Sequence, residues 1–287
     1  MTTTIGIIGG TGLYALDGLT EVREIRVDTP FGQPSDVLVT GKLAGMQLVF
    51  LPRHGRGHRL TPTEVPYRAN VFAMKALGAE WLIGFSSTGS MRENIHPGDV
   101  VIVDQYLDRT RMRVETFFGE GIVAHVSMAH PTCSRLGNHL AAAAKASGAT
   151  VHESGTLVCV EGPTFSTLAE SRAFRTQGVD VIGMTAMPEA KLAREAELHY
   201  TTVAMVTDFD CWHQDHEHVS VDVVLAMLKR NGATAKAMLE HALPGMSHVP
   251  GECRCASALG SALQTDRAVV PASRVEELRP IIGKYFV

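Results

Sequence analysis

The sequence predicts an α/β fold with a mixed central β-sheet flanked by helices. Short apolar runs alternate with amphipathic stretches along most of the 287 residues, which is typical of strands buried between helices. Two of the runs within the first fifty residues lie close together around a glycine-containing turn, which adds antiparallel pairing. Hydrophobic residues make up 45% of the chain and charged residues 20%, as in ordinary globular proteins.

The apolar runs give the expected strands. In chain order these are residues 5–8, 22–27, 37–39, 47–51, 81–85, 100–103, 155–160, 179–182 and 201–206. The helices are placed by their start and stop residues and by apolar spacing. We expect helices over 66–77, opened by Pro66 and stopped by Gly78; over 136–146; from a Thr167/Glu170 capping box to Gly178; after Pro188; and through Val221, Val224, Leu225 and Leu228.

The chain divides into a main domain and a tail. Residues 1–244 carry the strand–helix alternation and are interpreted as one domain. From Pro244 onward the texture changes to proline–glycine pairs and two short helical patterns, so residues 245–287 are expected to be a largely helical tail, packed on the same domain or on a neighbouring subunit. Ser273 and Glu276 have capping-box spacing for the last helix.

Composition excludes several classes of function. A net charge of −4 does not indicate a nucleic-acid partner. No signal-peptide pattern and no membrane-length apolar run is present, so a cytoplasmic protein is expected.

Of the five cysteines, Cys133, Cys159 and Cys211 are interpreted as buried small hydrophobes. Cys253 and Cys255 form a C-x-C pair, which could be a redox or metal element or simply two exposed thiols; a structural or redox role is favoured over a catalytic one.

Five expected strands end in polar residues of one chemical theme. The segments are 9–12, 53–58, 86–90, 183–185 and 207–210. Four of them offer glycine-exposed backbone N–H groups, hydroxyls, a guanidinium and an imidazole, which are ligands for phosphate. The fifth offers two carboxylates two residues apart, Asp208 and Asp210. Because ligands of such sheets bind beyond the carboxyl ends of strands, we expect phosphate as a reactant with the two acids serving another partner.

Two motifs admit other interpretations. Residues 10–15 match the G-x-G-x-x-A of a dinucleotide site, but Gly18 and the strand-like 22–27 follow where that fingerprint requires a helix. The run His213 to His218 contains possible metal ligands, but six polar residues before a helix are more typical of a solvated loop. No metal site is expected.

Seven segments together resemble the methylthioadenosine phosphorylase branch of the trimeric purine nucleoside phosphorylase family. They are IGIIGGTGL, DTPFGQPSD, RHGRGH, PGDVVIVDQYLDRT, VEGPTFST, ESRAFRTQGVDVIGMT and TDFDCW, in order between Ile5 and about Leu243. The resemblance implies the phosphorylase fold, a homotrimer or dimer of trimers, no cofactor, and inorganic phosphate as co-substrate. The implied reaction is phosphorolysis of 5′-methylthioadenosine to adenine and 5-methylthioribose 1-phosphate.

The resemblance also implies residue roles. Phosphate would be bound by Thr11, Arg53, His54, Ser86, the backbone of Ser87, and Thr185. Met184 would lie under the ribose, Phe165 and Ser166 would line the base site, and Asp208 and Asp210 would face the purine edge; Val221, Val224 and Leu225 would cover the 5′-substituent, and His125 would reach the pocket of a neighbouring subunit. The sequence departs from the family's common pattern at Thr164, Ser86–Thr88 and Gly183, which leaves fine selectivity open.

The carboxylate pair predicts a mechanism and a base. Burial and the like charge of Asp210 would raise the pKa of Asp208, which could then protonate the departing purine at N7. A 6-amino group can donate to an ionised acid, whereas a 6-oxo group cannot, so adenine is favoured. Three alternatives remain open at this point: a purine nucleoside phosphorylase of broader or 6-oxopurine specificity, a nucleoside hydrolase, and a non-catalytic nucleotide- or metal-binding protein.

Overall fold

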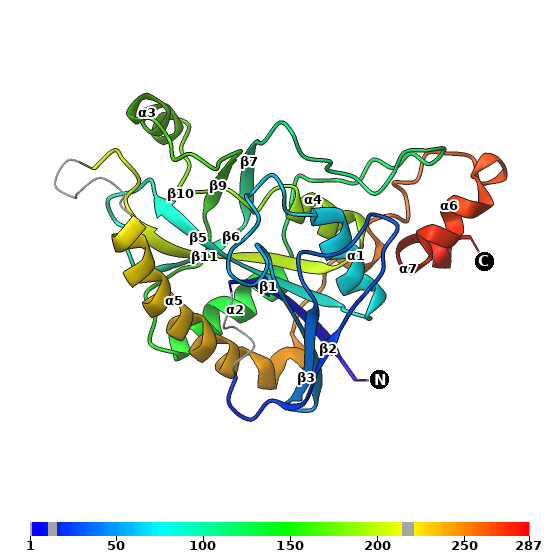
Figure 1. Cartoon of the computed structure of the whole chain (residues 1–287), viewed down its shortest axis with the longest axis horizontal. Helices are drawn as coiled ribbons and strands as arrows, with labels where there is room; N and C mark the ends of the chain where they lie inside the picture. Colours follow the sequence, from blue (N-terminus) through cyan, green and yellow to red (C-terminus); the bar gives the residue numbers. More distant parts are fainter. Residues whose placement is uncertain (1, 11–15, 214–220, 287) are drawn as a thin grey trace.

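The computed structural model describes residues 2–10, 16–213 and 221–286, without the side chains of 221–226 (Figure 1). Within those ranges eleven strands form one sheet. They are β1 (Thr4–Gly9), β2 (Thr20–Ile25), β3 (Leu38–Leu43), β4 (Met46–Pro52), β5 (Trp81–Ser90), β6 (Val100–Val103), β7 (Gln105–Arg109), β8 (Val151–His152), β9 (Thr156–Val160), β10 (Val181–Gly183) and β11 (His199–Asp208).

The described helices follow the predicted pattern. They are α1 (Tyr67–Ala76), α2 (Ser134–Ala146), α3 (Leu168–Thr176), α4 (Glu189–Glu195), α5 (Val221–Ala242), α6 (Ala272–Glu277) and α7 (Arg279–Ile282), with short 3-10 helices η1 (Leu243–His248), η2 (Cys255–Ser257), η3 (Arg267–Val269) and η4 (Gly283–Tyr285). The Thr167/Glu170 capping box at the start of α3 is confirmed. The cap at Ser273 is wrong: Pro271, with φ −62 and an extended backbone, precedes α6, so the helix begins at Ala272 and Ser273 lies inside it.

The sheet is mixed, as predicted. Its longest path runs β2-β3-β4-β1-β5-β10-β9-β7, and β11 pairs with both β5 and β6. β1 is parallel to β4 and to β5, and β5 is parallel to β11. β3 and β4 form the antiparallel hairpin that the first fifty residues predict. β5 and β11, each ten residues long, therefore lie at the centre of the sheet.

Two hydrophobic layers enclose the sheet because successive strand side chains point to opposite faces. Leu82 of β5 and Ala204 of β11 pack in the cluster that contains residues of α1 and α4, whereas Ile83 and Val203 pack in the cluster of α2 and α5. Figure 1 shows α1 and α4 on one side of the sheet and α2 and α5 on the other. This sandwich fixes the two central strands, whose carboxyl ends carry polar residues.

The tail after residue 244 shares the core of the rest of the chain. Leu259, Leu278 and Ile282 are fully buried in the same cluster as residues of α1 and α4. The tail also pairs with an earlier segment, because the His125 N–H donates to the Ala262 carbonyl over 2.8 Å. Among the described residues, no helix is long and apolar enough to cross a membrane.

Candidate active site

A cavity of about 980 Å³ opens at the carboxyl ends of the central strands. All five polar segments predicted from the sequence contribute to its lining. They do so through Gly9 and Gly10; Arg53 and His54; Ser86, Ser87, Thr88 and Gly89; Gly183, Met184 and Thr185; and Thr207, Asp208 and Asp210. A volume of this size is typical of sites that enclose a small molecule.

Strand direction explains why four of the segments meet. β1, β4, β5 and β11 are connected by parallel pairs, so their carboxyl ends lie at one edge. The fifth follows β10, which is parallel to β9 and antiparallel to β5, where it pairs with Gly89 and Ser90 at the end of β5. β10 therefore runs back along β5 and delivers Thr185 beside Ser86. The serine-rich segment 86–90 is itself strand, not the loop after a strand that the sequence predicted, because it pairs with β11 and β10.

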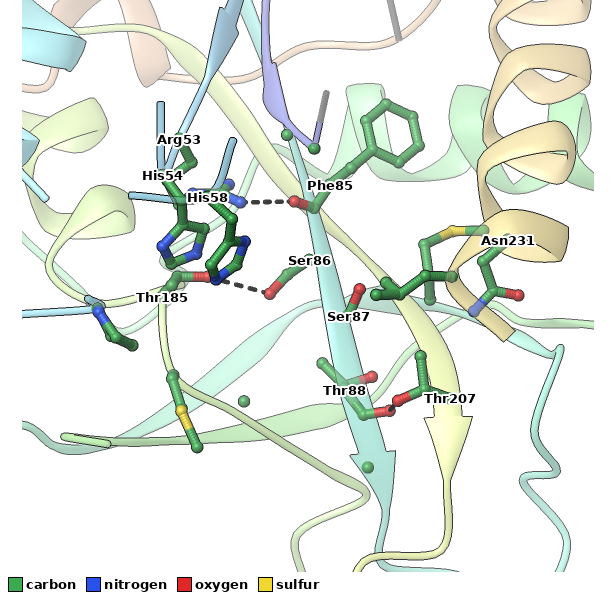
Figure 2. A pocket seen from close by; sticks show the side chains of 18 of the residues that line it. Arg53, His54, His58, Phe85, Ser86, Ser87, Thr88, Thr185, Thr207 and Asn231 are labelled. Atoms are coloured by element: carbon green, nitrogen blue, oxygen red, sulfur yellow. Dashed lines mark hydrogen bonds between the residues drawn. The ribbon is translucent and has the colours of Figure 1, made fainter. Parts of the chain in front are cut away.

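Hydroxyl groups form one side of the cavity (Figure 2). The side-chain oxygens of Ser86 and Thr185 lie 3.2 Å apart, and each residue is only 6% exposed. Ser87 beside them is exposed to the cavity. Thr88 Oγ1 is buried and has no hydrogen-bond partner among the described residues. The two adjoining hydroxyls can donate together to one anion.

Arg53 brings a buried positive charge to the cavity wall. Its Nε and one terminal nitrogen donate to the two carboxylate oxygens of Glu189 over 2.8 and 2.9 Å, and the other terminal nitrogen donates to the Phe85 carbonyl over 2.7 Å. A longer bond reaches the Ile8 carbonyl. Burial opposes the charge, but Glu189 outweighs burial and raises the pKa of Arg53. Within the described part of the chain four of its five N–H groups are used, so one can donate to a ligand.

His54 is neutral at physiological pH. Burial lowers the pKa of His54 to about 4, although its contact with the Leu60 carbonyl acts the other way. Its Nδ1 lies 2.8 Å from that carbonyl oxygen, which places the ring proton on Nδ1 and leaves Nε2 as an acceptor. The ring stacks on His58 with centroids 4.2 Å apart. His54 can therefore accept a hydrogen bond from a protonated phosphate oxygen, but it adds no positive charge.

Two carboxyl groups stand at the end of β11. Burial raises the pKa of Asp208, although hydrogen bonds from the Thr207 hydroxyl (2.6 Å) and the Asp210 N–H (2.8 Å) act in the opposite direction. Burial also raises the pKa of Asp210, and the charge of Asp208 adds to that shift. The raised pKa predicted for Asp208 is confirmed with burial as its cause, whereas the like charge acts on Asp210 instead. Both groups can hold a proton at higher pH than an exposed aspartate.

A glycine in β5 leaves room for the two carboxyl groups. A Cβ atom at Gly89 would lie 2.9 Å from Asp208 Oδ1 and 3.4 Å from the Asp210 Cβ, so the strand can approach the acids only with glycine there. Asp210 itself has φ +51, a left-handed conformation that aspartate tolerates better than most residues. The local bond from its N–H to Asp208 holds that turn.

Phe165 and Met184 add an apolar part to the cavity lining. Phe165, which is 54% exposed, Ser166 and Met184 all line the cavity. Gly162 has φ +67, and a Cβ there would lie 2.6 Å from the Met184 sulfur. Met184 is therefore packed directly on the loop that carries Phe165, where a flat ring would find a thioether and an aromatic side chain.

Some predicted residues are not placed in this cavity. Thr11 lies outside the described residues, as does most of the dinucleotide match, and the side chains of Val221, Val224 and Leu225 in α5 are also outside them. So is the histidine run beyond His213. His125 is exposed and does not line the cavity of its own chain.

The structure adds residues that the sequence did not single out for the site. Thr207 bonds Asp208, and Asn231 of α5 lines the cavity, where its Nδ2 donates to the Val206 carbonyl over 2.9 Å. Asn231 Oδ1 is buried without a partner in the described protein. A single asparagine in a helix gives no sequence signal. Cys211 is half-buried beside Asp210 and not a core residue, which corrects the prediction for it, whereas Cys159 is fully buried as predicted.

Comparison with known proteins assigns the family. The model of the Phosphorylase superfamily matches residues 4–244. The chain belongs to this superfamily. A phosphorylase from Geobacter sulfurreducens, named S-methyl-5′-thioadenosine phosphorylase, is 55% identical over 286 residues, covering 99% of this chain and 100% of the relative.

Solved phosphorylase structures agree with the fold. A methylthioadenosine phosphorylase from an antarctic soil metagenomic library superimposes with a TM-score of 0.93 at 45% identity and covers 98% of this chain and 99% of its own. A Schistosoma mansoni adenosine/methylthioadenosine phosphorylase variant in complex with methylthioadenosine has a TM-score of 0.82 at 37% identity, with 92% and 99% covered. The fold predicted from the sequence and the resemblance to phosphorylases are confirmed.

Proposed function

We propose that this phosphorylase cleaves the glycosidic bond of 5′-methylthioadenosine with inorganic phosphate, giving adenine and 5-methylthioribose 1-phosphate. The observation that carries the proposal is one cavity lined both by anion-binding groups and by two carboxyl groups with raised pKa values. The full-length relative and the solved neighbours are named for methylthioadenosine, which supports the same substrate here.

Phosphate binding is assigned to the hydroxyl wall. Ser86 and Thr185 donate to phosphate oxygens, helped by backbone N–H groups near Ser87, and Thr11 is proposed as a further donor on the strength of the family resemblance. Arg53 supplies its remaining N–H and a positive charge partly balanced by Glu189. His54 accepts from the protonated oxygen of monohydrogen phosphate through Nε2. The wall thus binds phosphate by directed hydrogen bonds more than by net charge.

The bond changes balance as follows. A phosphate oxygen forms a bond to C1′ while the bond from C1′ to the purine nitrogen breaks through an oxocarbenium-like state. The electron pair of that bond moves into the purine. Asp208, whose pKa is raised by burial, gives a proton to purine N7, so the base leaves as neutral adenine. The phosphate dianion stabilises the positive charge on the sugar.

Base and sugar recognition follow from the rest of the lining. Asp210 accepts a hydrogen bond from the 6-amino group of adenine, whereas a 6-oxopurine has an acceptor at that position. Phe165 and Ser166 line the base, Met184 lies under the ribose, and Val221, Val224 and Leu225 cover the methylthio group. Leu228 and Asn231 line the cavity from the same helix, α5, which supports that last assignment.

We also propose that the enzyme is cytoplasmic and acts as a homotrimer or dimer of trimers, with His125 reaching a neighbouring site. Large apolar side chains on the segment around His125 support an interface there, because Met112, Val114 and Val123 are 78%, 56% and 47% exposed. Light scattering of the purified enzyme tests the assembly: a mass of three or six chains is expected, and a monomer would contradict it.

The reaction is tested by product analysis. The purified protein is incubated with methylthioadenosine, with and without inorganic phosphate, and adenine and the sugar product are separated by chromatography. We expect adenine and a sugar phosphate only when phosphate is present. Equal adenine release without phosphate would identify a hydrolase, and no release under either condition would overturn the proposal.

Selectivity is measured in the same assay with adenosine and inosine. We expect kcat/KM to be highest for methylthioadenosine, and inosine to be disfavoured relative to adenosine by about 10- to 100-fold because its 6-oxo group leaves the acid pair unmatched. Faster cleavage of inosine would instead indicate a 6-oxopurine phosphorylase.

A further inference from the structure

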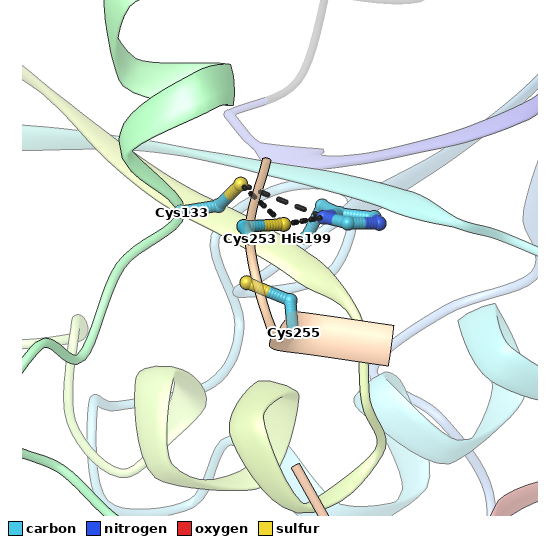
Figure 3. A group of neighbouring side chains, drawn as sticks. All are labelled: Cys133, His199, Cys253 and Cys255. Carbon is cyan, nitrogen blue, oxygen red and sulfur yellow. Dashed lines mark hydrogen bonds between the residues drawn. The ribbon is translucent and has the colours of Figure 1, made fainter. Parts of the chain in front are cut away.

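A second group of reactive side chains lies far from the cavity, at the amino end of β11 (Figure 3). Cys133 precedes α2, His199 is the first residue of β11, and Cys253 and Cys255 come from the tail. One donor atom from each of the four lies within 4.8 Å of every other. Cys133, which the sequence predicted to be an isolated small hydrophobe, thus contacts the C-x-C pair.

We propose that these four residues form a structural zinc site. Three thiolates and one imidazole are a ligand set that zinc prefers, and soft sulfur donors disfavour magnesium or calcium. The set contains four protein ligands, so it closes a tetrahedron without leaving a position for substrate. The proposal is independent of the phosphorylase activity.

The three separations among Cys133, Cys253 and His199 fit the edges of a tetrahedron, and the Cys255 sulfur lies within 4.8 Å of the other donors. With zinc–sulfur bonds of about 2.3 Å and zinc–nitrogen bonds of about 2.0 Å, sulfur–sulfur edges should be about 3.8 Å and sulfur–nitrogen edges about 3.5 Å. The sulfurs of Cys133 and Cys253 lie 3.8 Å apart, and their distances to His199 Nδ1 are 3.5 and 3.2 Å. Figure 3 shows the sulfur atoms and the imidazole ring turned toward one another.

The surroundings favour the thiolate form that binds metal. Cys133 is the N-cap residue of α2, whose amino end carries partial positive charge. An Arg194 N–H lies 3.5 Å from the Cys255 sulfur. Zinc with three thiolates carries one net negative charge, which Arg194 can balance.

The ring of His199 is also held in place for ligation. It stacks on Trp81, the first residue of β5, with centroids 4.3 Å apart. With the ring held in this way, Nδ1 faces the sulfurs, whereas a free surface side chain could present either ring nitrogen. Packing that fixes the orientation of a metal-binding histidine is typical of structural sites.

The consequence is a clamp on the tail. Zinc would tie residues 253–255 to the strand that bears Asp208 and to the start of α2. The nine residue steps from His199 to Asp208 correspond to about 30 Å, so the ion cannot take part in the reaction. None of the four ligands lines the cavity. The clamp instead stabilises the tail segment that pairs with the residues around His125.

Elemental analysis of the full chain, expressed without a metal-affinity tag, tests the proposal. We expect about one zinc per chain. Cys253→Ser and Cys255→Ser should each lose most of it, Cys253→His should retain it because histidine is also a zinc ligand, and Cys159→Ser is the matched control because that thiol lies outside the cluster.

A second measurement covers variants that fail to fold. A strong chelator should lower the Tm of the wild-type protein, and added zinc should restore it. Cobalt(II) in place of zinc should give thiolate-to-metal absorption bands in the wild-type protein and in Cys159→Ser, but not in Cys255→Ser. Protein free of metal with five titratable thiols, iron in place of zinc, or a mass lowered by the two hydrogens of a disulfide would overturn the assignment.

Discussion

The two ends of β11 show what separates a reactive site from a structural one. At the carboxyl end, Asp208 and Asp210 face a cavity of about 980 Å³, into which Asn231 also projects. At the amino end, the donors of His199 and three cysteines are turned toward one another. The strand between them is buried in both hydrophobic layers. The same strand thus carries both groups of polar residues. At one end they face a cavity, and at the other end they face one another.

The surroundings of the ionisable groups also differ between the two ends of β11. Burial raises the pKa of Asp208 and Asp210, which favours the protonated form needed by an acid catalyst. At the other end, an Arg194 guanidinium nitrogen donates to the Cys255 sulfur, and Cys133 is the N-cap residue of α2. Positive charge beside these sulfur atoms suits a metal complex with net negative charge, whereas the two acids are set mainly by burial.

The largest expected effect, on kcat, comes from replacing the proposed acid at the carboxyl end of β11. Asp208→Asn keeps the shape of the side chain but cannot deliver a proton to purine N7. We expect kcat for methylthioadenosine to fall by about 10²- to 10⁴-fold, the usual contribution of a general acid. Steady-state kinetics measure this, with Asp266→Asn as the matched control because that exposed residue caps η3 and asparagine caps equally well.

The outcome separates a catalytic from a packing role. If Asp208 is the acid, the variant should keep the Tm of the wild-type protein within a few degrees while losing turnover. A variant with unchanged kcat would contradict the assigned role. Loss of zinc in this variant would contradict the independence of the two ends.

A smaller effect concerns which base is accepted. Asp210→Asn replaces an acceptor-only group with an amide that can also donate, so the site can match a 6-oxo group. The ratio of kcat/KM for adenosine to that for inosine should fall by about 10- to 100-fold. Competition between the two nucleosides in one reaction measures that ratio directly, and an unchanged ratio would show that Asp210 does not contact position 6.

The sequence predicted most of this arrangement because local patterns carried it. Strand and helix positions follow from apolar spacing, and four of the five polar segments meet because parallel strands end at one edge. The antiparallel approach of β10 was not predictable, since three residues carry no signal of direction. Arg53 was found as a phosphate ligand, but its pairing with Glu189, 136 positions away, depends on tertiary contacts.

The thiol cluster was missed for the same physical reason. Cys133, His199 and the C-x-C pair are separated by more than fifty residues at each step, and Cys133 is buried as a small hydrophobe would be. Only the packing of the tail against β11 brings them together. Residues far apart in the sequence can be grouped into a site only when the tertiary structure is known. Residues at the ends of parallel strands can be grouped from the predicted topology alone.

The smallest expected effect is a shift in the pKa of Asp208 that leaves its carboxyl group in place. Thr207→Val keeps the shape of a buried β-strand residue but removes the hydroxyl 2.6 Å from Asp208 Oδ2. That hydrogen bond lowers the pKa of Asp208, so its loss should raise the pKa further. Since the acid must be protonated, kcat falls as pH rises through this pKa, and the variant's alkaline limb should move to higher pH.

The expected displacement is at most about one pH unit, because a neutral hydrogen bond contributes about 0.5–1.5 kcal/mol and one pKa unit corresponds to about 1.4 kcal/mol. Profiles of kcat against pH for the wild-type protein, Thr207→Val and Asp208→Asn measure it, and the last should lack the limb altogether. An alkaline limb that stays in place in Thr207→Val would show that the Thr207 hydroxyl donates to the Thr88 carbonyl, 3.1 Å away. This hydroxyl would then not contribute to the pKa of Asp208.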